Sequence, residues 1–106
     1  MIITTTSSVE GKQIMRYLGI VAGEAVTGSN LVDDLLRSLK GIMGGSVTKL
    51  EKSLLNARTM ALKQMEKRAA DLGANAVVAV DLDYQVLSAG EIIMMVIANG
   101  TAVEVA

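Results

Sequence analysis

The stretch that decides the fold lies at residues 48–73 and reads TKLEKSLLNARTMALKQMEKRAADLG. Thr48 and Glu51 form the T-x-x-E pattern of a helix capping box, and Gly73 is typical of a helix end. Apolar residues recur at spacings of three and four, which is the stripe of an amphipathic helix. These residues are Leu50, Leu54, Ala57, Ala61, Met65, Ala69 and Leu72. The sequence therefore predicts a long helix from Thr48 to Gly73 with one face on a core.

Strand-like segments lie on both sides of this helix. Residues 14–27 are apolar in both alternating registers, which favours a strand covered on two faces. Gly19 and Gly23 interrupt this segment and indicate bulges or a close approach of another backbone. Two further apolar runs lie at residues 76–86 and 92–105. The sequence therefore predicts three strands.

Smaller features complete the pattern. Residues 88–90, Ser-Ala-Gly, predict the hairpin turn that joins the last two strands. Asn99 and Gly100 interrupt the last strand and predict a bulge or kink, because glycine accepts a positive φ. Ahead of the long helix, residues 30–41 begin with an N-cap asparagine and predict a short helix. The Gly-Gly-Ser sequence at residues 44–46 predicts a flexible joint between the two helices.

The predicted order of elements is β-α-β-β, with the minor helix before the main one. At 106 residues the chain is expected to form a single domain over residues 1–106. We predict an α+β fold, a two-layer unit with a three-stranded antiparallel sheet, one long helix and one short helix. One long helix covers only one face of such a sheet. The other face would need a second copy of the chain to cover it.

The composition also indicates association. Hydrophobic residues make up 51% of the chain, and the mean hydropathy is +0.45. The longest apolar run, residues 92–98, is far shorter than the roughly 20 residues of a membrane-spanning helix. The first residues have no basic region before an apolar stretch, so we expect no signal peptide and no membrane insertion. The absence of cysteine fits a reducing compartment, and the sequence predicts a cytoplasmic homo-oligomer.

The residue types exclude several kinds of chemistry. Ten basic and eleven acidic residues give a net charge of −1, which supplies no field for attracting nucleic acid. Tyr17 and Tyr84 are the only aromatic residues, so base stacking has little to work with. The chain has no histidine, the usual general base and the commonest transition-metal ligand. We therefore expect no nucleic-acid partner, no visible catalytic constellation and no cofactor beyond a divalent metal ion.

Three segments resemble the YbjQ-like family: GIVAGEAV at residues 19–26, GANAVVAVDLDY at residues 73–84 and GTAV at residues 100–103. The resemblance covers nearly the whole chain, and the middle segment is its most specific part. It implies a dodecin-like β-α-β-β subunit in a ring-shaped homo-oligomer, typically a pentamer. It also implies the family's description, "putative heavy-metal-binding".

The residues give this description no soft-metal ligands of the usual kind. The chain has neither cysteine nor histidine. Methionine thioethers suit Cu(I), and Met94 and Met95 are adjacent in the sequence. Neighbouring residues of a strand point to opposite faces, so these two side chains cannot chelate one ion.

Two aspartates are candidate oxygen ligands. Asp81 and Asp83 lie on one face of the predicted strand, with their Cβ atoms about 7 Å apart. Carboxylates at this separation could hold a hard cation such as Mg²⁺ or Ca²⁺. A calcium site uses six or more oxygens, so a solvated strand end or ion pairs with basic residues of another subunit is the simpler interpretation.

Glu24 is the third candidate, because it lies in an otherwise apolar strand. A buried carboxyl group there could act as an acid, or it could pair with Arg16 or with an arginine of a neighbouring subunit. Pairing is favoured, because acid catalysis needs a partner base and the sequence offers none.

These observations lead to three hypotheses of function. The first is a non-enzymatic homo-oligomer whose crevices between subunits bind a small ligand or an ion. The second is a metal-binding protein that uses carboxylate oxygens of Asp81, Asp83 and Glu24 from adjoining subunits. The third and most remote is a carboxylate-based hydrolase, which would need two acids on either side of a cleft.

Overall fold

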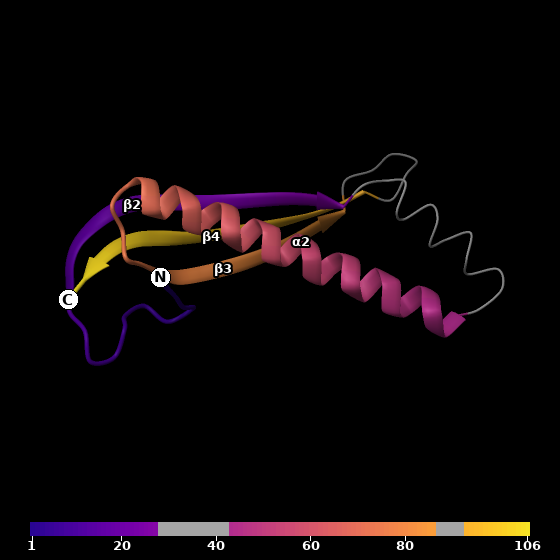
Figure 1. The fold of residues 1–106 in the computed structure, drawn as a ribbon, viewed down its shortest axis with the longest axis horizontal. Helices are drawn as coiled ribbons and strands as arrows, with labels where there is room; N and C mark the ends of the chain where they lie inside the picture. The colour runs from indigo at the N-terminus through magenta and orange to yellow at the C-terminus, as the bar shows by residue number, and fades with distance from the viewer. Residues whose placement is uncertain (28–42, 87–92) are drawn as a thin grey trace.

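The computed structural model describes residues 1–27, 43–86 and 93–106. Its elements are the strands β1 (Ile2–Ile3), β2 (Ile14–Thr27), β3 (Ala76–Val86) and β4 (Met94–Val105) and the helix α2 (Met43–Asp71) (Figure 1). The predicted strands at residues 14–27 and 76–86 are confirmed, and the return strand is confirmed from Met94 onward. The predicted short helix at residues 30–41 and the turn at residues 88–90 lie outside the described residues.

Helix α2 is longer than the sequence predicts. It begins at Met43, so the predicted flexible joint at residues 44–46 and the predicted cap at Thr48 are both wrong. Each glycine costs a helix about 1 kcal/mol relative to alanine, but the conformational preference of single residues is a weak guide to where a helix begins. The predicted end is confirmed. Gly73 takes a left-handed φ of 87°, and its N–H donates to the carbonyl of Ala70 at 2.9 Å.

The sheet has four strands in the order β1-β3-β4-β2. Strands β2 and β3 both run antiparallel to β4, whereas β1 pairs parallel with β3 at Ala76 and Val77. The prediction of a three-stranded, wholly antiparallel sheet is therefore wrong, because it lacks the parallel strand β1. A two-residue strand is too short to show an alternating pattern, so β1 leaves no signal in the sequence. The fold is a mixed α+β fold, as predicted.

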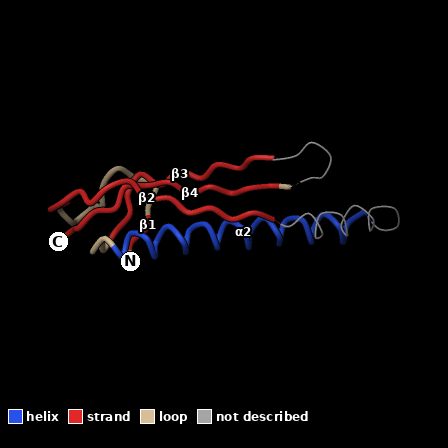
Figure 2. Tube along the Cα trace, turned by 90° about the horizontal axis from the view of Figure 1, so that it is seen from above, coloured by secondary structure: helices blue, strands red, loops and turns tan. Residues whose placement is uncertain are grey.

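Helix α2 packs on one face of the sheet over β2 and β4 (Figure 2). The core between the two layers contains Val21, Ala25, Ala57, Ala61, Met65, Ala69, Val77, Val80, Val96, Ala98 and Ala102. Gly23 lies at the closest point of contact. A Cβ atom there would overlap the carbonyl oxygen of Ala61 and come within 2.7 Å of the Met65 nitrogen. The predicted close approach of another backbone at this glycine is confirmed.

Two bulges shape the sheet. Gly19 has a φ of 128° and lies at a register shift of β2 against β4, as expected for a glycine in that strand. The second bulge is in β3, where Ala79 and Val80 lie opposite the single residue Gly100. The bulge predicted at Asn99 and Gly100 therefore belongs to the partner strand, and Ala79 has the positive φ, at 54°. Gly100 is needed for space, since a Cβ atom there would lie 2.5 Å from Cγ1 of Val77.

Among the described residues, those near the chain's beginning cover part of the other face of the sheet. Val9 and Ile14 pack there on a second, smaller core of Ala76, Val78, Val103 and Val105. The side chain of Asn75 fastens this end, because its amide accepts from the Val105 N–H and donates to the Val105 carbonyl, both at 2.8 Å. Strands β2, β3 and β4 continue beyond this second core toward the other end of the sheet. None of the described helical residues forms a segment long and apolar enough to cross a membrane.

Candidate functional site

The three predicted carboxylates lie on one face of the sheet, the face away from α2. Asp83 and Glu24 both align with Ile97 of β4, and Asp81 aligns with Asn99. The residues on either side of Ile97 are buried beneath α2, so Ile97 and Asn99 point to the opposite face. The structure therefore brings all three acids to one surface.

They do not form a metal site within one copy. Glu24 and Asp83 lie in strands on either side of β4, which places their Cα atoms about 10 Å apart at the usual strand spacing. Across the described ranges, no three histidine, cysteine, aspartate or glutamate residues are grouped so that they could hold a metal ion. A cation on this face would need further ligands from another molecule.

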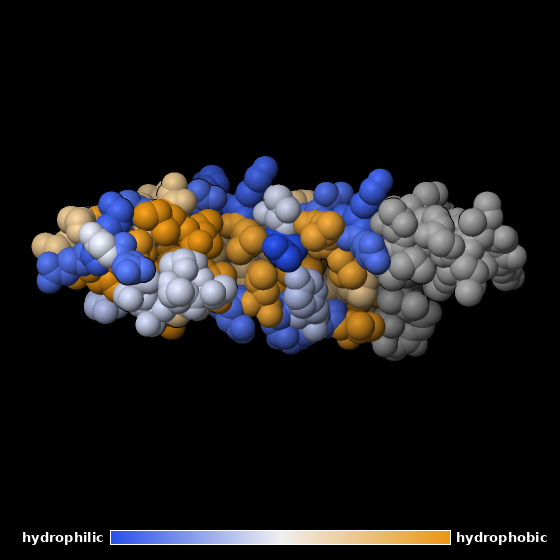
Figure 3. All heavy atoms as spheres, turned by 90° about the horizontal axis from the view of Figure 1, so that it is seen from below, coloured by the Kyte–Doolittle hydropathy of each residue, from blue (hydrophilic) through white to orange (hydrophobic). Residues whose placement is uncertain are grey.

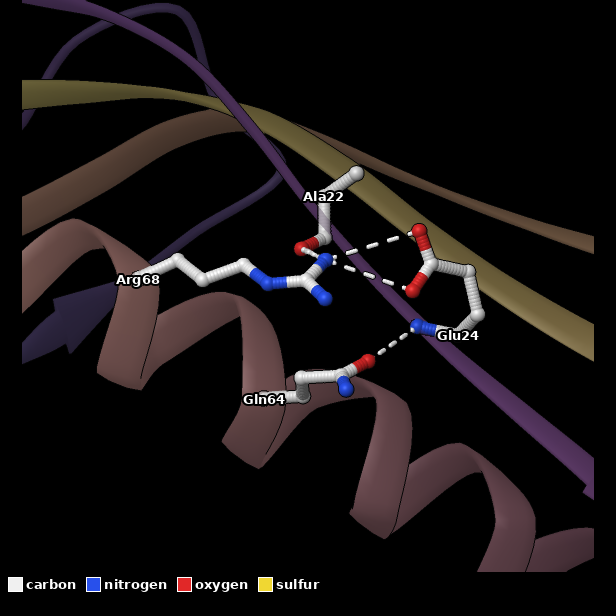
Figure 4. Close-up of polar contacts among 4 residues, drawn as sticks. All are labelled: Ala22, Glu24, Gln64 and Arg68. Atoms are coloured by element: carbon white, nitrogen blue, oxygen red, sulfur yellow. Dashed lines mark hydrogen bonds and ion pairs between the residues drawn. The ribbon is translucent and has the colours of Figure 1, made fainter.

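Glu24 is bound by the helix. Arg68 of α2 donates from Nη1 to the Glu24 carboxylate oxygens, at 3.2 Å to Oε2 and 3.4 Å to Oε1 (Figure 4). The same Nη1 donates to the carbonyl of Ala22 at 2.7 Å. One turn earlier in the helix, the Gln64 side chain accepts from the Glu24 backbone N–H at 2.7 Å.

We call Gln64 and Arg68 the edge clamp, because they bind backbone groups of β2 that face away from β4. The clamp closes part of the outer edge of β2, which is the last strand of the sheet on this side. Of the two partners predicted for Glu24, Arg16 is not the one observed. Arg16 instead pairs with Glu104 across the sheet at 2.8 Å.

The two aspartates have fewer contacts. Oδ2 of Asp83 accepts from the side chain of Gln85 at 3.2 Å. Both aspartates and Gln85 are exposed. The two aspartates form a short acidic row along β3, without a basic partner from the described part of the same copy.

Two pockets lie at the other end of the molecule. The first, of about 490 Å³, is lined by Ile2, Thr4, Thr6, Ser8, Val9 and Glu10. The second, of about 550 Å³, is lined by Met1, Ile2, Lys12, Ala74, Asn75 and Val105. In the first, Thr6 Oγ1 donates to the Ser8 carbonyl at 2.6 Å and is hydrogen bonded to Thr4 Oγ1 at 2.8 Å. These hydroxyl groups bind one another, and neither pocket is lined by a predicted carboxylate.

Large apolar side chains are exposed on both faces of the sheet. On the face away from α2, Ile20 is 85% exposed and Tyr17 72%. On the helix side, Tyr84 and Val86 of β3 are 51% and 67% exposed. The space-filling view from below shows hydrophobic residues at the surface along much of the described length (Figure 3).

One long helix on a four-stranded sheet, with acidic and apolar side chains exposed on the strands, defines a small α+β protein. The chain belongs to the YbjQ-like family, because the family model described as "Putative heavy-metal-binding" matches residues 1–106. The resemblance found in the sequence is thereby confirmed.

Relatives cover nearly the whole chain. A "UPF0145 protein" of Geobacillus kaustophilus is 52% identical over 103 residues, covering 97% of this chain and 96% of the relative. Another of Anoxybacillus flavithermus is 51% identical over 104 residues, covering 98% and 97%. A crystal structure of a protein of unknown function of the DUF74 family from Pediococcus pentosaceus has a TM-score of 0.61 at 16% identity. It covers 100% of this chain and 98% of its own, and it supports the fold.

The residues present do not fit the heavy metal of the family description. Soft heavy metals prefer thiolate and imidazole ligands, and the chain has neither cysteine nor histidine. Met94 and Met95 are consecutive in β4, so their side chains leave the strand on opposite faces. The chain instead offers carboxylate oxygens, which suit hard cations.

The edge clamp was not predicted from the sequence. Gln64 and Arg68 are four residues apart and so lie on one side of the helix, which the sequence does reveal. Their contact with Ala22 and Glu24 depends on how α2 lies across the sheet. Gly23, far away in the sequence, leaves the space for this close contact.

Proposed function

We propose that this protein is a non-enzymatic, cytoplasmic homo-oligomer whose crevices between copies bind a small ligand or an ion. The family resemblance suggests a ring of five copies. The proposal depends on one observation, the large apolar side chains left bare on the strands of a single copy.

The bare side chains are large enough to matter energetically. Ile20 is 85% exposed in the middle of a 14-residue strand. Fully burying a side chain of this size stabilises by about 1.5–3 kcal/mol. Tyr17 and Val26 add to the same face of β2, while Tyr84 and Val86 lie on the helix side of β3. Burial against further copies would remove all of these surfaces from water.

The chemistry of a crevice between copies follows from the residues at the sheet edges. Asp81 and Asp83 would supply carboxylate oxygens, and Arg68 would supply guanidinium N–H groups. Such a crevice could hold a small polar ligand or a cation without any catalytic base.

Size-exclusion chromatography with light scattering tests the assembly. We expect a mass several times the 11.1 kDa of one chain, and about five times that mass if the ring suggested by the resemblance forms. A clean monomer at micromolar concentration would refute the proposal.

A metal-binding function is the second candidate, because Asp81 and Asp83 share one exposed face and Glu24 lies on the same face. In an assembly, acids of adjoining copies could complete the oxygen ligands that one copy lacks. Titration calorimetry with Mg²⁺, Ca²⁺, Mn²⁺ and Zn²⁺ tests it on the wild type and on Asp81→Asn/Asp83→Asn. We expect the heat of binding to disappear in the variant.

Asp71→Asn is the matched control, because Asp71 is an exposed carboxylate at the end of α2, away from the acidic row. It should leave the heats unchanged. Equal heats from the wild type and the double variant would remove Asp81 and Asp83 from any metal site.

A further inference from the structure

Helix α2 covers the sheet unevenly. It packs closely on β2 and β4 and makes few contacts with β3 (Figure 2). The far half of β3 therefore has bare apolar side chains on its helix side. Leu82 is partly buried against the core, whereas Tyr84 and Val86 are 51% and 67% exposed. We call Leu82, Tyr84 and Val86 the bare surface of β3.

The outer edge of β3 is also open over this half. The chain's first residues bond to β3 up to the bulge, where the N–H groups of Ala79 and Val80 donate to the carbonyls of Thr6 and Thr4. Beyond Val80, the described residues include no further backbone partner on this side.

The alternation of an antiparallel sheet shows which groups are open. The edge clamp binds the Ala22 carbonyl and the Glu24 N–H, so these two residues face away from β4, and Gly23 between them faces β4. Gly23 is aligned with Ala98 of β4, so the backbone groups of Ala98 point to β2 and those of its two neighbours point to β3. These neighbours are aligned with Asp81 and Asp83, whose own backbone groups therefore point to β4. The N–H and C=O groups of Leu82 and Tyr84 therefore point outward from the open edge.

The opposite side of the molecule has a complementary surface. Met60, Gln64 and Arg68 recur every four residues on α2, and Lys67 lies beside them, seven residues after Met60. Since Gln64 and Arg68 reach over the edge of β2 (Figure 4), this side of the helix overhangs that edge. We call Met60, Gln64, Lys67 and Arg68 the overhanging flank. Its Met60 is 63% exposed.

The two surfaces match in charge as well as in polarity. Asp81 and Asp83 lie at the edge of β3 on the face away from α2. The overhanging flank carries Lys67 and Arg68, and Arg68 reaches that face at the edge of β2, where it pairs with Glu24. Within the described part of the chain, Lys67 pairs with the exposed Asp71 of its own helix. Opposite charges placed along two surfaces fix their register and disfavour wrong pairings.

We propose that the edge of β3 in one copy docks beneath the overhanging flank of α2 in the next copy. Met60 of the second copy then covers the bare surface of β3 on the helix side, and Arg68, which reaches over the edge of β2 to the face that carries Glu24, meets Asp81 and Asp83 on that same face. This contact joins two different surfaces, and each copy carries both of them. Successive copies therefore associate head to tail. The inference rests on the proposed homo-oligomer and specifies which surfaces build it.

Two variants, each with one damaged surface, test the contact. Tyr84→Pro removes one outward N–H and the ring from the edge of β3, while leaving the hydrogen bonds to β4 in place. Met60→Glu/Lys67→Glu makes the overhanging flank more acidic and leaves both residues of the edge clamp unchanged. By light scattering we expect each variant alone to be a monomer. Mixed in equal amounts, they should form a dimer of twice the 11.1 kDa chain mass, because one sound surface remains on each.

Thr59→Glu/Lys63→Glu is the matched control for the flank. It introduces the same change in charge on exposed residues of α2 that lie opposite the buried row, and the mass should stay that of the wild type. Far-UV circular dichroism checks that each variant is folded. If Tyr84→Pro is not folded, Tyr84→Asp takes its place, because it keeps the backbone N–H.

The outcomes separate this inference from the proposed function. An oligomeric wild type whose mass is unchanged by both variants would place the interface elsewhere and overturn the inference alone. Folded variants that stay monomeric when mixed would also overturn it, because an interface between identical surfaces gives no rescue. A monomeric wild type would overturn the homo-oligomer and this contact together.

Discussion

Gly23 sets the distance between the two layers of the fold. A methyl group at this position would overlap the Ala61 carbonyl and press on the Met65 nitrogen, and these are backbone atoms that cannot rotate away. We predict that Gly23→Ala lowers the free energy of unfolding by about 1–3 kcal/mol, as overpacking does. Urea unfolding measures it. Thr59→Ala, at an exposed position on the solvent side of α2, should change stability by less than about 0.5 kcal/mol. Equal effects of the two changes would contradict the close contact.

Ala79 is the only described non-glycine residue with a positive φ. An L-residue in the left-handed region costs about 1–2 kcal/mol, and a β-branched residue costs more because of its crowded Cβ. Ala79→Val should therefore lower the melting temperature. Ala79→Gly should leave it equal or raise it, since relief of the strain is partly offset by greater freedom of the unfolded chain. Thermal unfolding followed by circular dichroism compares them. A valine variant as stable as the glycine variant would argue against the bulge.

Individual residues differ in how far the sequence reveals their roles. Gly19 and Gly23 could be predicted, because a glycine inside an apolar strand often marks a bulge or the close approach of another backbone. Ala79 could not, because alanine gives no sign of a left-handed backbone. Asp81 and Asp83 could be placed on one face from alternation alone. The distance of Glu24 from them depends on the strand order, which the sequence pattern does not contain.

At the scale of elements, the edge clamp ties α2 to β2. The Gln64 side chain accepts the outward N–H of Glu24, so Gln64→Ala should expose that one amide to solvent. We expect its hydrogen exchange, followed by NMR, to become faster. The stability loss should be about 0.5–1.5 kcal/mol, the usual net value of a hydrogen bond. Thr59→Ala, on the solvent side of the same helix, should leave this amide unchanged. Unchanged exchange in Gln64→Ala would mean that the clamp does not form in solution.

The elements that could be predicted were those whose apolar residues recur at a regular spacing in the sequence. The buried row of α2 and the alternation of β3 follow directly from spacing in the sequence. The start of α2 was missed, because the capping pattern at Thr48 is local while helix extension through two glycines depends on context. Strand β1 was missed because its two residues gain their structure only by pairing with β3.

At the scale of the whole molecule, the shape is unusual for a monomer of this length. The radius of gyration is 17.0 Å, against about 13 Å for a compact chain of 100 residues. The cause is visible in Figure 1, where α2 runs well beyond the described strands. A long helix on a narrow sheet leaves much surface uncovered in one copy. A second copy placed beneath the overhanging flank would turn this open arrangement into a continuous layer.

If assembly buries these surfaces, folding and association are linked. A partner that binds only the folded chain stabilises it by mass action, so the melting temperature should rise with protein concentration. Thermal unfolding over a roughly hundredfold range of concentration measures this effect. Met60→Glu/Lys67→Glu should melt at one temperature throughout that range, whereas Thr59→Glu/Lys63→Glu should behave as the wild type does. A wild-type melting temperature independent of concentration would indicate that a single copy is stable alone, and that its bare apolar strands serve a purpose other than self-association.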